Sequence, residues 1–172
     1  MNAQEARSTM TQLARVLALV TIAATYSVSA KPGAFADTLT FEGVVFSRQG
    51  TGELKARALL TSVTICEFAK YEARDNNQSP RPRLLVLRFA RKLSVDQLKQ
   101  VFRGVVEGKS GYSEAELKAF LDLLPSVAAD SLVNFRADSK GALEVFAGSK
   151  QLGSVASPQL VTALWAGLGT DT

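Results

Sequence analysis

Hydrophobic and polar positions in the first half of the chain follow the pattern of β-strands. Residues 38–48 (TLTFEGVVFSR) are rich in β-branched and aromatic side chains, and residues 50–68 form one long, mostly uncharged run. We expect two strands here, joined as a hairpin by a turn at residues 49–52. Residues 83–89 (RLLVLRF) form a continuously apolar segment that is typical of a strand buried on both faces. The first half therefore predicts three strands.

After residue 93 the period of the apolar positions becomes helical. Ser94 and Gln97 form a capping box at the start of a segment, residues 94–107, whose apolar side chains recur every three or four positions. The same signal recurs at Ser113 and Glu116, ahead of a second apolar stripe. We expect two amphipathic helices in tandem, packed on one face of a sheet.

The last third of the chain returns to strands and ends in a helix. Strand-like segments cover residues 131–136, 143–146 and 151–155. Ser157 then provides a helix cap and Pro158 stands at the first helical position. The order β-β-β-α-α-β-β-β-α predicts the α+β class, with an open antiparallel β-sheet and helices packed on one face.

The N-terminal segment has the features of a secretory signal peptide. Residues 1–15 carry two arginines, residues 16–24 are uncharged and apolar, and small residues follow at 28–30 and 34–36. The apolar run is shorter than the ~20 residues that span a bilayer. We expect a signal peptide over residues 1–36 and a single domain over residues 37–172, in the periplasm or secreted. Cleavage after Ala30 fits the small-residue rule as well as cleavage after Ala36. An uncleaved anchor and an amphipathic or core helix are the alternatives.

The composition of the chain excludes several classes of partner and of catalytic site. The 172 residues are 47% hydrophobic, which suffices for one good core, and the net charge of +4 is scattered, so we expect no nucleic-acid partner. The chain has no histidine and a single cysteine, Cys66. This excludes histidine-based acid–base catalysis, Ser-His triads and the common zinc sites, and we expect no metal and no cofactor. Cys66 lies in a strand-like run, which indicates a buried, unreactive thiol.

Several stretches, in their shared order, resemble the chalcone isomerase-like superfamily, in its bacterial exported branch. They are Gly50-Thr51-Gly52, residues 83–89 followed by 92–98, residues 117–124, residues 148–155, and residues 163–164 with 168–169. The resemblance implies an open antiparallel sheet with a ligand cleft between the sheet and its helices. Members of the family include plant enzymes that close a chalcone to a flavanone, fatty-acid-binding proteins, and bacterial proteins of unknown role. Both functional branches need a cation in the cleft.

The chain departs from the family pattern at that cation. The family has Gly-x-Gly-x-Arg, whereas Leu54 stands at the arginine position here. Period-2 alternation places one row of side chains on the cleft face: Leu54, Ala56, Ala58, Leu60, Ser62, Thr64, Cys66 and Phe68. Lys55, Arg57 and Glu67 then point the other way. A one-residue slip or a bulge would swap the faces and bring Lys55 and Arg57 inside.

The leading hypothesis is a non-catalytic protein that binds a small apolar or amphipathic ligand, such as a fatty acid. Ser62 and Thr64 are the expected polar contacts, with Arg57 or Arg88 as the cation. Arg88 lies within an apolar strand and must be paired or exposed, so a structural ion pair is the alternative to a ligand contact.

Two other functions remain open. One is an isomerase of the intramolecular-lyase type in which Lys55 or Arg57 replaces the lost arginine. The other is a structural or partner-binding envelope protein whose cleft has filled with side chains.

Overall fold

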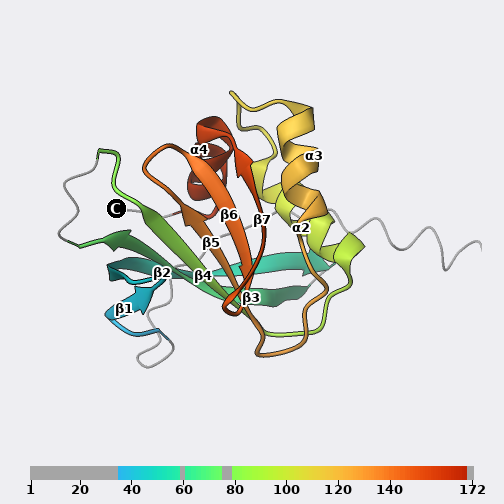
Figure 1. The fold of residues 1–172 in the computed structure, drawn as a ribbon. Coiled ribbons are helices and arrows are strands. Elements are labelled where there is room, and N and C mark those ends of the chain that lie inside the picture. Colours follow the sequence, from blue (N-terminus) through green and yellow to red (C-terminus); the bar gives the residue numbers. More distant parts are fainter. Residues whose placement is uncertain (1–34, 59–60, 75–78, 170–172) are drawn as a thin grey trace, which may run out of the picture.

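Seven antiparallel strands form one sheet in the computed structural model, which describes residues 35–58, 61–74 and 79–169. Each strand pairs with the next along the chain, so the spatial order equals the sequence order. The strands are β1 (Thr38–Phe41), β2 (Val44–Ala58), β3 (Thr61–Ala73), β4 (Arg83–Phe89), β5 (Leu132–Ala137), β6 (Ala142–Ala147) and β7 (Lys150–Ala156). Figure 1 shows the sheet curling around its helices.

In the described part of the chain, three helices pack on one side of this sheet (Figure 1). They are α2 (Val95–Val106), α3 (Glu114–Asp122) and α4 (Pro158–Gly167). The predicted α+β class, with an open antiparallel sheet and helices on one face, is confirmed. We call the side of the sheet that carries the helices the helix-side face, and the opposite side the outer face. None of the helices in the described part of the chain is long and apolar enough to cross a membrane.

The helix starts are where the sequence predicts them. The side chains of Ser94 and Ser113 accept hydrogen bonds from the backbone N–H groups three residues on, and both capping boxes are complete. Ser157 accepts from the N–H of Leu160 in the same way, with Pro158 in the first turn. These contacts are local in sequence, which is why the sequence pattern reveals them.

The long run of residues 50–68 is not one strand, as predicted, but parts of two. β2 ends at Ala58 and β3 begins at Thr61, so the sheet has seven strands rather than six. The predicted turn at residues 49–52 is also wrong, because those residues lie inside β2. The first turn is instead Glu42-Gly43, where φ is 49° and 75°. A two-residue turn with both φ values positive matches the twist of the flanking strands.

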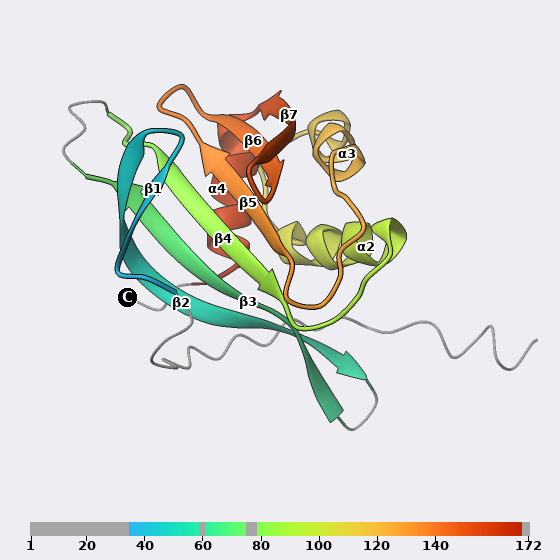
Figure 2. The same ribbon diagram turned by 60° about the horizontal axis from the view of Figure 1, so that its bottom comes forward.

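Two hydrophobic cores lie on the two faces of the sheet. The larger one fills the helix-side face, where Phe102 of α2, Phe120 of α3 and Phe135 of β5 meet edge to face with ring centroids 5.2 to 5.8 Å apart. The smaller one lies on the outer face, around Phe46 and Tyr71. The β1–β2 hairpin turns back over this outer face (Figure 2). There the rings of Phe41 and Phe146 lie 4.9 Å apart.

The predicted signal peptide lies almost entirely outside the described residues. Its last two positions, Phe35 and Ala36, are described and contact the outer face. The remainder of that prediction therefore stays a prediction.

Candidate functional site

The strand pair β2–β3 positions the side chains that the sequence analysis singled out. Leu54 pairs with Cys66, but the next residue, Lys55, pairs with Thr64, so Ile65 is an extra residue in β3. This bulge reverses the alternation beyond it. Leu54, Ala56, Cys66 and Phe68 belong to the helix-side core, as predicted.

Ser62 and Thr64 do not share that face, and this part of the prediction is wrong. They pair with the backbone positions of Arg57 and Lys55, in the outer-face register. A bulge was one of the sequence-based expectations, but it was expected to bring Lys55 and Arg57 inside. The bulge instead lies in β3 and turns Ser62 and Thr64 outward, so the two predicted polar contacts lie away from the helices.

Two of the predicted cations of the outer face, Arg88 and Lys55, have carboxylate partners. Arg88 forms an ion pair with Glu67 of the neighbouring strand, and its guanidinium lies over the ring of Phe35 at 5.6 Å from the centroid. Lys55 lies 2.8 Å from the carboxylate of Glu53. These contacts match the structural alternative that the sequence analysis gave for Arg88.

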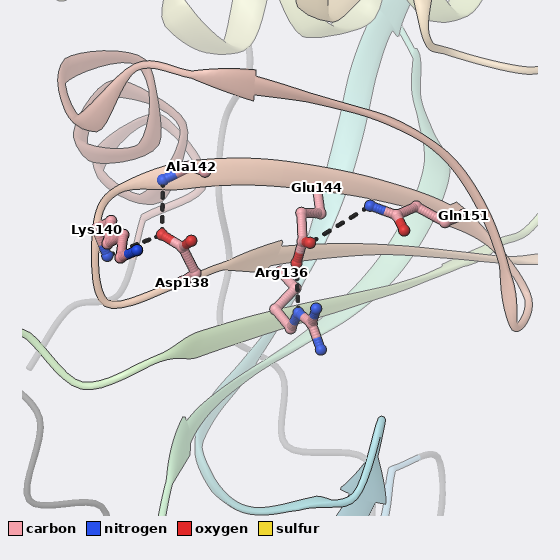
Figure 3. Close-up of polar contacts among 6 residues, drawn as sticks. All are labelled: Arg136, Asp138, Lys140, Ala142, Glu144 and Gln151. Carbon is pink, nitrogen blue, oxygen red and sulfur yellow. Dashed lines mark hydrogen bonds and ion pairs between the residues drawn. The ribbon is translucent and has the colours of Figure 1, made fainter.

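A second set of polar contacts crosses the outer face of β5, β6 and β7 (Figure 3). The carboxylate of Glu144 binds the guanidinium of Arg136 and accepts from the amide of Gln151 at 3.3 Å. Asp138 accepts from the backbone N–H groups of Lys140 and Ala142, each at 2.8 Å, and so fixes the β5–β6 turn. The hydrogen bond to Glu144 raises the pKa of Arg136. These groups satisfy one another, which indicates a structural role.

The arginine position of the family is part of the packed core. Leu54 is 1% exposed and belongs to the same helix-side core as the Phe102–Phe120–Phe135 cluster. Cys66 beside it is fully buried, and burial raises the pKa of its thiol far above the usual range, as expected of an unreactive cysteine. Neither side chain can stabilise an anion.

A cation does lie on the helix-side face, at a position that the sequence analysis missed. Lys70 of β3 is 5% exposed, and its ammonium donates to the carbonyl oxygen of Trp165 in α4 at 2.8 Å. Burial, together with the nearby charge of Arg83, lowers the pKa of Lys70 to about 8. An ammonium group has three N–H donors. Within the described residues, one of them has a protein acceptor.

Arg83 of β4 supplies a second positive charge next to Lys70. Its guanidinium lies 5.0 Å from the centroid of the Trp165 ring, and burial lowers its pKa, against a smaller opposing effect of Glu72. Glu72 is shared with Arg81, whose guanidinium lies 3.5 Å from its carboxylate. Arg81 and Arg83 share this one carboxylate, and Lys70 and Arg83 both contact Trp165, so two positive charges lie near the end of α4.

Lys70 continues the row of β3 side chains that faces the helices. Cys66, Phe68 and Lys70 alternate along the strand, and the last two pair with Gly52 and Gly50 of β2. A Cβ atom on Gly52 would lie 2.5 Å from the ring of Phe68, so glycine is required for the ring to lie against the β2 backbone. A row of buried, apolar core side chains therefore leads to the buried ammonium. We call Lys70, Arg83, Trp165 and Phe68 the Lys70 site.

No metal site is found among the described residues, because no three or more Cys, Asp or Glu side chains come close enough to hold an ion.

Comparison with known proteins supports the fold. No family model matches the sequence, and no curated protein sequence matches it. Among solved structures, the chain is similar to a fatty-acid binding protein from Arabidopsis thaliana, with a TM-score of 0.65 and 17% sequence identity. The match covers 82% of this chain and 87% of the plant protein. The chain thus has the chalcone isomerase-like fold.

Proposed function

We propose that this protein is exported and binds a small amphipathic molecule with a carboxylate head, such as a fatty acid, without catalysing a reaction on it. The observation that carries the proposal is Lys70, a buried ammonium on the helix-side face at the end of an apolar row of side chains. A carboxylate needs a cation, and its alkyl chain needs an apolar surface. The Lys70 site offers the cation, and its apolar neighbours are side chains of the helix-side core.

The surroundings of Lys70 favour an anion over a neutral ligand. An unpaired charge is costly to bury, and among the described residues Lys70 donates to a neutral carbonyl. Arg83 adds a second charge of the same sign, which a bound carboxylate would offset. The next side chains of this row, Phe68 and then Cys66, are apolar and belong to the helix-side core.

The fold similarity supports the same class of ligand. The plant protein that shares the fold is a fatty-acid binding protein. In this chain the cation would lie at Lys70 rather than at Leu54. The rise of about 3.3 Å per strand residue puts Lys70 roughly 13 Å along β3 from Cys66, the partner of Leu54. The head group would therefore bind at the opposite end of the apolar row.

The described residues favour binding over isomerase chemistry. An isomerase of this family stabilises a developing enolate with a cation and hydrogen-bond donors at the cleft, whereas Leu54 is buried in the core. Lys55, the proposed substitute, lies on the outer face beside Glu53. Incubation with hydroxylated chalcones should give only the uncatalysed rate of ring closure, and a faster rate would show that the protein is an enzyme.

A partner-binding role would require a large exposed apolar patch. Over the described surface, the large hydrophobic side chains that are exposed are Val45 and Leu132, each at 44%. They lie on β2 and just at the start of β5, so they offer little area for a protein partner.

Native mass spectrometry with a matched pair of ligands tests the proposal. The protein is mixed with dodecanoate or with dodecanol, which has the same chain length and no charge. We expect a one-to-one complex with dodecanoate and little or none with dodecanol. Equal binding of both, or of neither, would refute a carboxylate-binding site.

Trp165 is the single tryptophan, so its fluorescence should change on adding dodecanoate.

A further inference from the structure

Phe35 and Ala36, which the sequence assigns to the end of the signal peptide, are built into the folded domain. Phe35 packs against the outer core, and the guanidinium of Arg88 lies 5.6 Å from the centroid of its ring. That guanidinium also forms the ion pair with Glu67. The aromatic ring therefore covers one of the ion pairs of the sheet.

The backbone of this segment is bound as well as its side chain. The carbonyl oxygen of Phe35 accepts a hydrogen bond from the guanidinium of Arg48, which also pairs with the carboxylate of Asp37. The carbonyl oxygen of Ala36 accepts from the hydroxyl of Tyr71 at 3.0 Å. Tyr71 is 1% exposed and belongs to the outer core. A buried hydroxyl requires such an acceptor.

Cleavage after Ala36 would remove these contacts. The Phe35 ring and both carbonyl acceptors would be lost, and a new ammonium group would form on Asp37, next to the Arg48 guanidinium. Signal removal precedes folding, so the folded contacts do not block the peptidase. They do mean that a chain cut after Ala36 would have to fold without part of its outer face.

We propose that the signal peptide is removed after Ala30, and that Phe35 and Ala36 remain in the mature protein. A signal peptidase would hydrolyse the Ala30–Lys31 peptide bond with one water molecule, leaving a carboxylate on Ala30 and an amine on Lys31. Val28 and Ala30 supply the small residues that such cleavage requires. A signal peptide of about 30 residues is also within the usual range, whereas 36 residues exceed it.

The intact mass of the exported protein tests this directly. The full chain is expressed in a bacterial host, the periplasmic fraction is isolated, and the mass is measured. We expect the mass of residues 31–172. A chain that starts at Asp37, or one that still starts at Met1, would overturn the proposal. This test does not depend on ligand binding.

A matched pair of substitutions separates the two cleavage sites. Ala30→Phe places a large side chain where a small one is required, and should reduce processing strongly. Ala36→Phe makes the same change at an exposed position, and should leave the extent and position of processing unchanged. The opposite pattern would contradict the proposal.

Thermal unfolding tests whether the segment before Asp37 stabilises the fold. Chains beginning at Lys31 and at Asp37 are compared, and the shorter one should unfold several degrees lower. Tyr71→Phe removes the hydroxyl that donates to the Ala36 carbonyl oxygen. It should therefore narrow the difference in melting temperature between the two chains. Equal melting temperatures for the two chains would show that the segment contributes nothing to the fold, and would remove the basis of the proposal.

Discussion

Charged residues on the two faces of the sheet differ in their partners. On the outer face, Arg88 and Arg136 each bind a carboxylate of a neighbouring strand. On the helix-side face, Lys70 donates to a backbone carbonyl and lies near a second cation, Arg83. A paired charge on the outer face is already compensated. The charge at Lys70 is compensated only in part, and it is therefore the better candidate for binding an anion.

The lowered pKa of Lys70 predicts how stability depends on pH. Between about 8 and the ordinary value of 10.5, the unfolded chain holds this proton more tightly than the folded one. The free energy of unfolding should therefore gain a rising contribution from Lys70 as the pH increases from 8 toward 10. Lys70→Met should lack this contribution. Urea unfolding of both proteins between pH 7 and 9.5 measures this contribution. If the difference in the free energy of unfolding between the two proteins stays constant with pH, the lowered pKa of Lys70 is contradicted.

Lys70 could have been found from the sequence, whereas the positions of Ser62 and Thr64 could not. The alternation that groups Cys66 with Phe68 continues to Lys70, two residues further along the same strand. The bulge at Ile65 reverses the faces before that point, and an isoleucine in an apolar run gives no signal of a bulge. The wrong placement of Ser62 and Thr64 therefore comes from the register of β3, because these residues do lie in a strand.

At the scale of elements, helices were predicted well and the first strands were not. A helix start depends on contacts three residues apart, as at Ser94 and Ser113, and these are visible in the sequence. β2 ends at Ala58 and β3 begins at Thr61. Leu59 and Leu60 follow there, and neither is a residue that marks turns. The run therefore resembled one long strand.

The close packing of β2 on β3 predicts a specific cost at Gly52. Gly52→Ala adds a Cβ atom that would lie 2.5 Å from the Phe68 ring. We expect a loss of about 1–3 kcal/mol in the free energy of unfolding, as for other overpacked cores. Phe68→Leu alone also destabilises, but it should reduce the additional cost of Gly52→Ala. Chemical unfolding of the four proteins of this cycle measures the coupling. Additive effects would show that the ring does not rest on Gly52.

At the scale of the whole molecule, the order of elements was enough to predict the fold class. Runs of strands followed by runs of amphipathic helices predict an antiparallel sheet with the helices packed on one side. The second core was not predicted, because it forms when the β1–β2 hairpin turns back over the outer face. That contact joins Phe41 to Phe146, which are distant in the sequence. No local pattern reveals such a contact.

The candidate site, like the second core, is formed by residues that are distant in the sequence. Lys70 and Trp165 are 95 positions apart and meet because α4 returns to the sheet near β3. The resemblance to the family directed attention to Leu54, where the family cation would be. The folded chain instead presents its buried cation at Lys70, at the other end of the apolar row.

The binding of dodecanoate to the wild-type protein and to Lys70→Met tests the central claim most directly. Isothermal titration calorimetry gives the affinity, with Lys150→Met, an exposed lysine of β7, as the matched control. A charge-assisted hydrogen bond contributes roughly 1.5–3 kcal/mol, so Lys70→Met should bind about 10- to 100-fold more weakly. Lys150→Met should bind as the wild type does. Wild-type affinity in Lys70→Met would contradict the account.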